Sequence, residues 1–541
     1  AAVTINGGTL VSTGTATITN NISIGAGGGT IAAASGQTLT ASGIISGANA
    51  LTVGSAGNTG IVALSGANTY TGSTTISAGT LQLNPGGTIS SSSSIINNAA
   101  LVYANNIVNT SNGVTGSGTI GVNSGSTLQL TGALGTTGLV TINTGGVLDL
   151  NGQSNTGAIS LSGTGISSAG ALINSSATAA TQSGDVTLAG ATSIGGTGNI
   201  TISGIISGSN ALTKVAANTL TLSGANTYTG STTISAGTLQ LNPGGTISSS
   251  SSIINNAALV YANNIVNTSN GVTGSGTIGV NSGSTLQLTG ALGTTGLVTI
   301  NTGGVLDLNG QSNTGAISLS GTGISSAGAL INSSATAATQ SGDVTLAGAT
   351  SIGGTGNITI SGIISGSNAL TKVAANTLTL SGANTYTGST TISAGTLSIS
   401  AANNLSGAAV TINGGTLVST GTATIANAIT LGAGGGTIAA ASGQTLTANG
   451  IISGSGALTV GSATNTGTVV FGNASNALTG GTTINTGTLS ISAAGNLGTA
   501  ASNAINLTNG GTLLSTGTAT ITNPFFFLAG GGKFAATTGQ V

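Results

Sequence analysis

A segment of 158 residues occurs twice in this chain without a single change, and no other feature limits the possible folds as strongly. Residues 64–221 are followed directly by the identical residues 222–379, and a third copy begins at Leu380 and diverges after Leu397. Sandwiches and barrels have a finite number of strands, so an inserted unit of this size would prevent their closure. A stack of coils accepts the insertion because each repeat contacts only its neighbours. The repeat therefore favours a solenoid.

A second family of repeats flanks the two identical units. Residues 1–60 reappear as residues 408–467 with a few substitutions, and the opening of the same repeat returns in residues 504–541. Two identical units imply a recent duplication, which adds length but would add nothing to a unique active site. We therefore predict one continuous β-solenoid over residues 1–541, as a segment of a longer repeat protein.

Short runs of alternating residues predict strands throughout the repeats. Leu81 and Leu83 alternate with Thr80 and Gln82, which places both leucines on one face of an extended chain. Gly and Asn separate such runs, as in residues 143–146, and both residue types tolerate positive φ in turns. With roughly 20–24 residues per coil, the sequence predicts an all-β solenoid of roughly 25 coils without amphipathic helices.

Charged side chains are almost absent, with 3 Lys or Arg and 4 Asp or Glu in 541 residues. Stacked coils place equivalent side chains ~4.8 Å apart, where like charges repel and Ser, Thr and Asn can hydrogen-bond along the stack. The absence of His and Cys excludes conventional zinc, iron–sulfur and haem ligation, imidazole bases and thiol nucleophiles. Three cations cannot form the basic surface that nucleic acid requires. We therefore expect no enzyme activity, no cofactor and no metal.

The most specific motif lies in residues 220–241. It reads Leu-Thr-Leu-Ser-Gly-Ala-Asn-Thr-Tyr-Thr-Gly, followed by Ser-Thr-Thr-Ile-Ser-Ala-Gly-Thr-Leu-Gln-Leu. This motif closely resembles the autotransporter-associated β-strand repeat, or passenger-associated transport repeat, of Gram-negative surface proteins. Full matches to this motif lie at residues 64–83, 222–241 and 380–397. A weaker match spans residues 476–489, with Leu478 in place of the Tyr. The preceding residues 211–214 fit the usual lead-in of the family. The resemblance implies a right-handed parallel β-helix that is exported to the cell exterior.

Four aspartates occupy two positions of the repeated unit, namely Asp149 and Asp185 with their copies Asp307 and Asp343. A pair of carboxylates could serve acid–base chemistry, as in pectin-cleaving β-helices. Here 36 residues separate the two positions, the chain has no Arg, and Lys214 is the only cation nearby in the sequence. We interpret the aspartates as solvent-facing substitutions on strands or turns. A contact between Lys214 and Asp185 on neighbouring coils is an alternative, worth ~0–1 kcal/mol if exposed.

Other candidate sites also have structural interpretations. The glycine clusters at residues 27–29 and 353–356 lack the Asp of calcium-binding β-roll repeats and the Lys and helix of a phosphate loop, so we expect tight corners. Tyr70, Tyr228 and Tyr386 occupy one repeat position, where a sugar-binding platform would consist of isolated rings. We interpret them as structural tyrosines at coil corners. The sequence thus indicates no catalytic, cofactor-binding or metal-binding residue and leaves any ligand-binding residue unknown.

One local anomaly lies close to residue 541. Phe525, Phe526 and Phe527 form a run, with Lys533 and Phe534 shortly after it. A bulky cap or docking coil and simple sequence drift are both compatible with this cluster. If the run is a strand with Phe526 facing outward, it forms an exposed apolar patch.

Together these features favour an extracellular structural protein of the bacterial surface, associated with the outer membrane and serving as a neutral, elongated stalk, fibre or sheath. A net charge of −1 gives almost no colloidal repulsion, so we expect head-to-tail or lateral self-association, with other cell-surface components as further partners. The alternatives are an adhesin passenger that presents a binding surface and an ice-binding solenoid, for which residues 15–17 and 38–40 read Thr-x-Thr. No apolar run approaches the ~20 residues of a membrane helix, so we expect no membrane-spanning segment. With so few titratable groups and no His, we expect a nearly constant unfolding midpoint from about pH 5 to about pH 9.

Overall fold

The computed structural model describes residues 1–110, 113–268, 271–498 and 503–537. Parallel strands stack into a β-solenoid of about 26 turns, which confirms the predicted all-β fold. The described residues contain no α-helix, and only short 3-10 turns interrupt the strands. These turns are Ile166–Ser168, Ile324–Ser326, Ala402–Asn404 and Ala494–Leu497.

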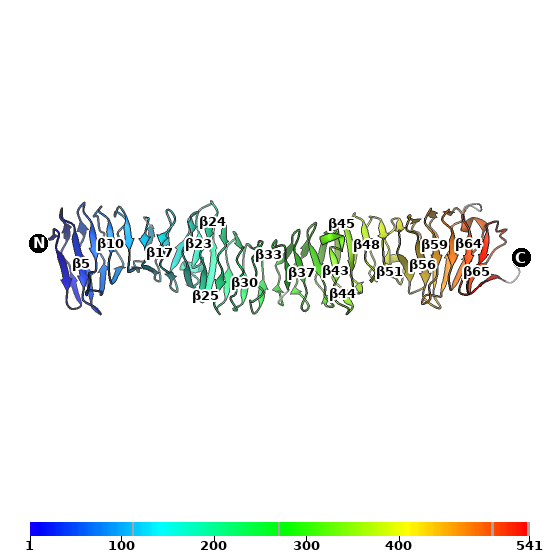
Figure 1. Ribbon diagram of the computed structural model, residues 1–541, viewed down its shortest axis with the longest axis horizontal. Helices are drawn as coiled ribbons and strands as arrows, with labels where there is room; N and C mark the ends of the chain where they lie inside the picture. The colour runs from blue at the N-terminus through cyan, green and yellow to red at the C-terminus, as the bar shows by residue number, and fades with distance from the viewer. Residues whose placement is uncertain (111–112, 269–270, 499–502, 538–541) are drawn as a thin grey trace. The chain divides into compact units, whose positions relative to one another are not determined.

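The first compact unit comprises Ala1–Asn263 and Gly274–Gly276. Successive turns of the chain each add one strand to a parallel sheet, as the blue to green strands of Figure 1 show. One such sheet consists of β2 (Thr9–Ser12), β5 (Gly29–Ala33), β8 (Leu51–Val53), β10 (Thr74–Ile76), β12 (Ile95–Asn97), β15 (Thr115–Gly116) and β18 (Gly135–Thr136). Another row consists of β3 (Ala16–Ile18), β6 (Thr38–Ala41), β9 (Ile61–Leu64), β11 (Thr80–Leu83), β13 (Ala100–Tyr103) and β16 (Thr119–Val122).

The second compact unit comprises Asn264–Thr273 and Thr277–Val541. Its largest complete sheet has eleven parallel strands, again one from each successive turn. They are β41 (Ser312–Asn313), β44 (Ala338–Gln340), β46 (Ile358–Ile360), β49 (Thr377–Leu380), β51 (Thr396–Ile399), β53 (Thr416–Ser419), β56 (Gly436–Ala440), β59 (Leu458–Val460), β62 (Thr482–Ile484), β64 (Ile505–Leu507) and β66 (Phe525–Phe527). A six-stranded sheet consists of β54 (Ala423–Ile425), β57 (Thr445–Ala448), β60 (Thr468–Phe471), β63 (Thr488–Ile491), β65 (Gly511–Ser515) and β67 (Gly532–Ala536).

Aliphatic ladders that run from turn to turn form the core of each unit. Leu81 of β11 pairs in register with Val62 of β9 and Leu101 of β13, and all three side chains are buried. Thr80 and Gln82 of the same strand are partly exposed, so the predicted alternation is confirmed. Burial of a leucine side chain contributes about 1.5–3 kcal/mol. Because its neighbours along the stack provide this burial, each turn depends on the turns before and after it.

The corners between strands require a close approach of the backbone of successive turns. Gly237 lies between β30 (Thr232–Ile234) and β31 (Thr238–Leu241) and has a φ of 70°. A Cβ atom at this position would lie 2.3 Å from the carbonyl oxygen of Asn218 on the preceding turn. Both the positive φ and the contact exclude a side chain, which explains the glycine in the Ser-Ala-Gly-Thr-Leu part of the motif.

Candidate functional site

The lead-in strand of the motif ends in a buried lysine. Lys214 is the last residue of β28 (Leu212–Lys214) and is only 1% exposed. Its three N–H groups are shared among four oxygens within hydrogen-bond distance of Nζ, namely Val215 O (2.6 Å), Ala216 O (2.9 Å), Asn218 Oδ1 (2.8 Å) and, on the next turn, Ala236 O (3.2 Å). Burial lowers the pKa of Lys214 to about 8. The ammonium group therefore closes a corner of the solenoid through carbonyl and amide oxygens.

The copy of this lysine has the same surroundings. Lys372 is buried, its Nζ donates to Ala374 O and to Asn376 Oδ1 at 2.8 Å each, and burial lowers its pKa to about 8. The corresponding strands of the flanking repeats end in Val53 and Val460 instead. The lysine corner thus belongs to the duplicated unit, at residues 214 and 372, and not to every copy of the motif. Its signal in the sequence is the spacing of Leu212 and Lys214, which places the lysine on the inward face.

Two further polar residues of the motif are buried. Asn226 accepts a hydrogen bond from the backbone N–H of Ile206 at 2.8 Å and donates to Thr246 O at 3.0 Å, so one side chain joins three successive turns. Tyr228 is buried, and its hydroxyl lies 2.6 Å from Thr232 Oγ1. Burial raises the pKa of Tyr228, so its phenol stays protonated.

The other tyrosines of this repeat position have equivalent contacts. The hydroxyl of Tyr70 lies 2.6 Å from Thr74 Oγ1, and that of Tyr386 lies 2.7 Å from Thr390 Oγ1. Both rings are buried. These tyrosines are interior residues of the turns and provide no exposed aromatic platform.

Asp149 and Asp307 are buried, so the prediction that their carboxylates face solvent is wrong for both. Asp149 is 2% exposed and accepts four hydrogen bonds. The donors are Gln129 Nε2 (2.8 Å), Asn151 N (2.9 Å), Ser175 N (3.0 Å) and Ser175 Oγ (2.6 Å). Asp307 is buried in the same way and accepts from Ser333 Oγ at 2.6 Å. All of these donors are neutral, so the carboxylate fixes the turn through hydrogen bonds from uncharged groups.

Asp185 and Asp343 are exposed, as expected. The Oδ1 atom of Asp185 accepts a hydrogen bond from the backbone N–H of Ile205 at 2.9 Å. The alternative contact between Lys214 and Asp185 is not formed, because the ammonium of Lys214 is bonded to oxygens of its own corner. No group of three or more His, Cys, Asp or Glu side chains that could hold a metal ion occurs among the described residues.

The glycine clusters have conformations of corners and strand ends. In residues 27–29, the N–H of Gly28 donates to Gly25 O at 2.9 Å, and this turn leads into β5. Gly353 and Gly354 are the last two residues of β45 (Val344–Gly354). Neither cluster has a carboxylate next to it in the chain.

The phenylalanine cluster is an exposed apolar patch on the last described strands. Phe526 and Phe527 are 51% and 57% exposed, and Phe534 of β67 is 53% exposed. The ring of Phe534 packs edge-on against those of Phe525 and Phe527, with centroid distances of 5.0 and 5.5 Å. Phe527 pairs in register with the buried Leu507, so it occupies a core position that no further described turn covers.

A comparison with known protein families identifies the repeated motif. The model of the passenger-associated-transport-repeat matches five segments of the chain, at residues 58–83, 212–241, 370–399, 396–418 and 462–491. The chain carries passenger-associated transport repeats. Four of these segments contain the matches predicted from the sequence, and the segment 212–241 includes residues 212–214 of the lead-in. Sequence reasoning missed residues 396–418, where Asn403-Asn404-Leu405-Ser406-Gly407 stands in place of Asn-Thr-Tyr-Thr-Gly.

These repeats and the solenoid fold fit the passenger domain of an autotransporter, a class of secreted or cell-surface protein. No curated protein and no solved structure matches the chain. Within the described ranges, no helix has the length and apolar character needed to span a membrane. The buried Lys, Asn and Tyr residues show that the polar part of the repeat serves the contacts between turns.

Proposed function

We propose that this chain is an exported structural part of a bacterial surface protein, in which the solenoid serves as a stalk, fibre or sheath element and associates with further copies of itself. The passenger-associated transport repeats support its export to the cell exterior. The observation that carries the structural role is the almost complete absence of charge from the surface.

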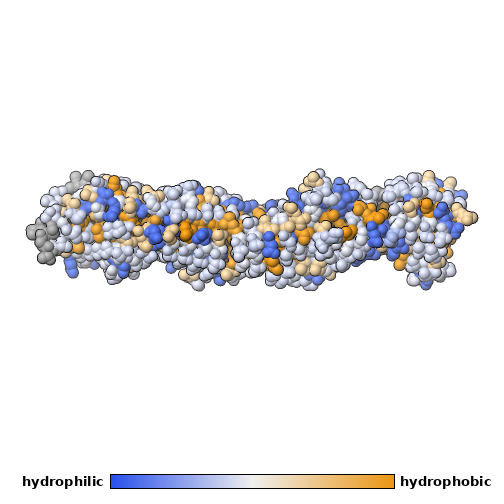
Figure 2. All heavy atoms as spheres, turned by 180° about the vertical axis from the view of Figure 1, so that it is seen from behind, coloured by the Kyte–Doolittle hydropathy of each residue, from blue (hydrophilic) through white to orange (hydrophobic). Residues whose placement is uncertain are grey.

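Burial removes most of the few charged side chains from contact with solvent. Of the seven in the sequence, four are buried, namely Lys214, Lys372, Asp149 and Asp307. The other three, Asp185, Asp343 and Lys533, are exposed. Figure 2 shows a mostly pale surface, on which small hydrophobic patches alternate with small hydrophilic ones. Copies of such a chain repel each other weakly, and contact between them requires the desolvation of few ions.

A threonine ladder in the second unit provides a regular surface for lateral contact. Six partly exposed threonines of successive turns pair in register, namely Thr377, Thr396, Thr416, Thr437, Thr459 and Thr483. The positions two residues further along the first four strands hold Thr379, Ser398, Val418 and Ala439. The ladder thus lacks a second row of threonines, so an ice-binding surface of regular Thr-x-Thr pairs receives less support than lateral association.

The turn formed by β66 and β67 supports longitudinal stacking. Phe527 and Phe534 pair in register with Leu507 and Leu513, which are buried, yet both phenylalanines are largely exposed. A following turn, from the same chain or from a second copy, would bury these rings, and a phenylalanine ring carries a large apolar area.

Electron microscopy and light scattering of the purified chain test this proposal. We expect fibres or bundles in the wild type. Thr396→Lys combined with Thr437→Lys adds two cations to the ladder on alternate turns, so it should reduce association at low salt and permit it again at high salt, where charges are screened. Thr396→Ser with Thr437→Ser is the matched control. Wild-type chains that stay monodisperse at all concentrations and salts would contradict the proposal, and glycan-array binding by such single chains would indicate an adhesin instead.

A further inference from the structure

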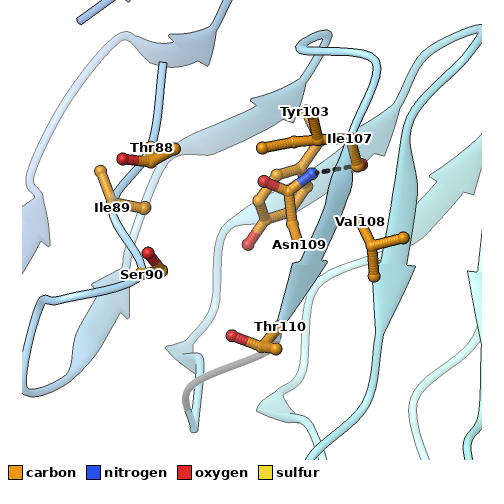
Figure 3. A pocket seen from close by; sticks show the side chains of 8 residues that line it. All are labelled: Thr88, Ile89, Ser90, Tyr103, Ile107, Val108, Asn109 and Thr110. Carbon is orange, nitrogen blue, oxygen red and sulfur yellow. Dashed lines mark hydrogen bonds between the residues drawn. The ribbon is translucent and has the colours of Figure 1, made fainter. Parts of the chain in front are cut away.

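A small cavity in the first unit is lined by a buried hydroxyl group for which the described part of the chain provides no hydrogen-bond partner. The cavity has a volume of about 90 Å³ and lies between the loop before β12 and the segment around β14 (Val108–Thr110). Its lining residues are all uncharged, and they are Thr88, Ile89, Ser90, Tyr103, Ile107, Val108, Asn109 and Thr110. Figure 3 shows the ring of Tyr103 between Ile89 and Asn109, with its hydroxyl directed across the open space toward the side of Ser90.

Tyr103 occupies an inward position that belongs to aliphatic side chains in the neighbouring turns. It pairs in register with Leu83 on one side and Val122 on the other. Tyr103 is 1% exposed, and its hydroxyl has no hydrogen-bond partner among the described residues. Burial raises the pKa of this phenol, so the group remains an O–H that can both donate and accept. A buried polar group without a partner costs about 1–3 kcal/mol, and folded proteins rarely leave one unsatisfied.

Asn109 provides a second polar atom at the cavity. Its Nδ2 donates to Asn105 Oδ1 at 2.8 Å and to Ile107 O at 3.1 Å, the bond that is dashed in Figure 3. Its Oδ1 accepts from Asn105 Nδ2 at 2.7 Å, and an amide oxygen can accept two hydrogen bonds. The paired amides hold Asn109 rigidly, and in Figure 3 its oxygen is turned from Ile107 toward the side of Ile89.

The apolar side chains define the rest of the cavity. Ile89 is buried, whereas Ile107 and Val108 are 41% and 58% exposed and stand at the rim. A cavity needs a volume of about 10–15 Å³ to hold one water molecule, so this cavity is large enough for several waters or one small molecule. Cavities of drug-binding size are several times larger. A neutral lining of aliphatic groups, hydroxyls and one amide matches a molecule that has both C–H faces and hydroxyl groups.

We propose that this cavity is a binding site for a neutral, hydroxyl-bearing ligand of the size of a single sugar residue, which hydrogen-bonds to the Tyr103 hydroxyl and the Asn109 amide oxygen and packs on Ile107 and Val108. The identical repeat carries the same sequence in residues 246–268, and the hydroxyl of Tyr261 is likewise buried with no partner in the described ranges. Self-associated chains would present this site as an array in which weak sites act together. The proposal does not depend on the fibre function, because a single chain contains the site.

Ligand-observed NMR and calorimetric titration test the site, with methyl glycosides of glucose, galactose and N-acetylglucosamine as probes. We expect millimolar binding of at least one probe by the wild type. Tyr103→Phe combined with Tyr261→Phe removes the hydroxyls and keeps the rings, so the affinity should fall about three- to tenfold, the value of one neutral hydrogen bond. The unfolding midpoint without ligand should stay the same or rise, because the variant removes an unsatisfied group.

Tyr70→Phe combined with Tyr228→Phe is the matched control. These hydroxyls are bonded to Thr74 and Thr232, so the control should lower stability and leave probe binding unchanged. Tighter binding of an oligosaccharide end than of the matching methyl glycoside would assign the site to polysaccharides, and equal binding would assign it to free sugars. If no probe binds at millimolar concentration, or if Tyr103→Phe with Tyr261→Phe binds as the wild type does, the cavity holds ordered water only and the proposal is wrong.

Discussion

Raising the pH from about 8 to about 10 should stabilise the folded chain, because two buried lysines lose their charge in this range. The pKa values of Lys214 and Lys372 are about 8 in the folded state, against 10.5 for a free lysine side chain. Between these values the unfolded chain binds more protons than the folded chain, so the free energy of unfolding rises with pH. Below about pH 8 both states are protonated, and the lysines cause no pH dependence. The constancy expected from the composition therefore applies only up to about pH 8.

The magnitude of this effect is limited by the size of the pKa shift. A fall from 10.5 to about 8 corresponds to at most about 3 kcal/mol per lysine, at about 1.4 kcal/mol for each pKa unit. The oxygens around each Nζ favour the charged form and oppose the desolvation. We therefore expect a gain of about 1–3 kcal/mol for each lysine between about pH 8 and about pH 10.

Five buried tyrosines have the opposite effect above about pH 10. Burial raises the pKa of Tyr70 to about 12 and raises the pKa values of the other four from their usual value of 10.0. From about pH 10 upward, the unfolded chain loses phenolic protons that the folded chain retains, so the free energy of unfolding falls. The lysines and tyrosines together predict a maximum of stability near about pH 10.

Guanidinium unfolding at successive pH values, followed by circular dichroism, measures this profile. Solenoid turns can unfold in separate groups, so hydrogen exchange of the amides around Lys214 should be measured in parallel. Lys214→Met with Lys372→Met should abolish the rise and lower stability at neutral pH, because the corner oxygens lose their donor. Lys533→Met is the control, since Lys533 is exposed and should not affect the profile. A flat wild-type midpoint between about pH 8 and about pH 10, or a rise that persists in the double variant, would refute this reasoning.

Substitutions at three kinds of position test the packing of the turns: the buried aspartates, an inward leucine and a corner glycine. Asp149→Asn with Asp307→Asn should destabilise the folded state by about 1–3 kcal/mol per site, as measured by denaturant unfolding, because an amide nitrogen would face hydrogen-bond donors; unchanged stability would mean that the carboxylates are hydrated. Leu81→Ala should cost about 2–5 kcal/mol in local hydrogen exchange, whereas a comparable cost for the partly exposed neighbour Gln82→Ala would contradict the inward and outward assignment. Gly237→Ala should lower the unfolding midpoint through its positive φ and the contact with the preceding turn, and a midpoint equal to that of the wild type would show that this corner can relax.

The strands could be predicted from the sequence because alternation is local, whereas the burial of polar residues could not. Leu81 and Leu83 point inward as expected, since their spacing alone determines the face on which they lie. Asp149 stands between Leu148 and Leu150, and an outward position on this strand agrees with the expectation that it faces solvent. It is buried because Ser175, 26 residues later in the chain, covers it and donates to both of its oxygens. Whether a loop covers an outward position depends on how the next turn is routed, which periodicity does not encode.

Lys214 is the opposite case. The alternation in the sequence indicates its buried position, but a charged residue is not normally expected there. The alternation of Leu212 and Lys214 predicts an inward lysine, whereas the high cost of an unpaired buried charge argues for a surface position. The corner carbonyls and Asn218 provide the missing partners, and they become visible only when the turn is built. The same holds for the Tyr103 cavity, which lies outside all five matched segments. The polar groups of the repeat motif are occupied with joining turns, so the intervening turns are where this solenoid can acquire a binding site.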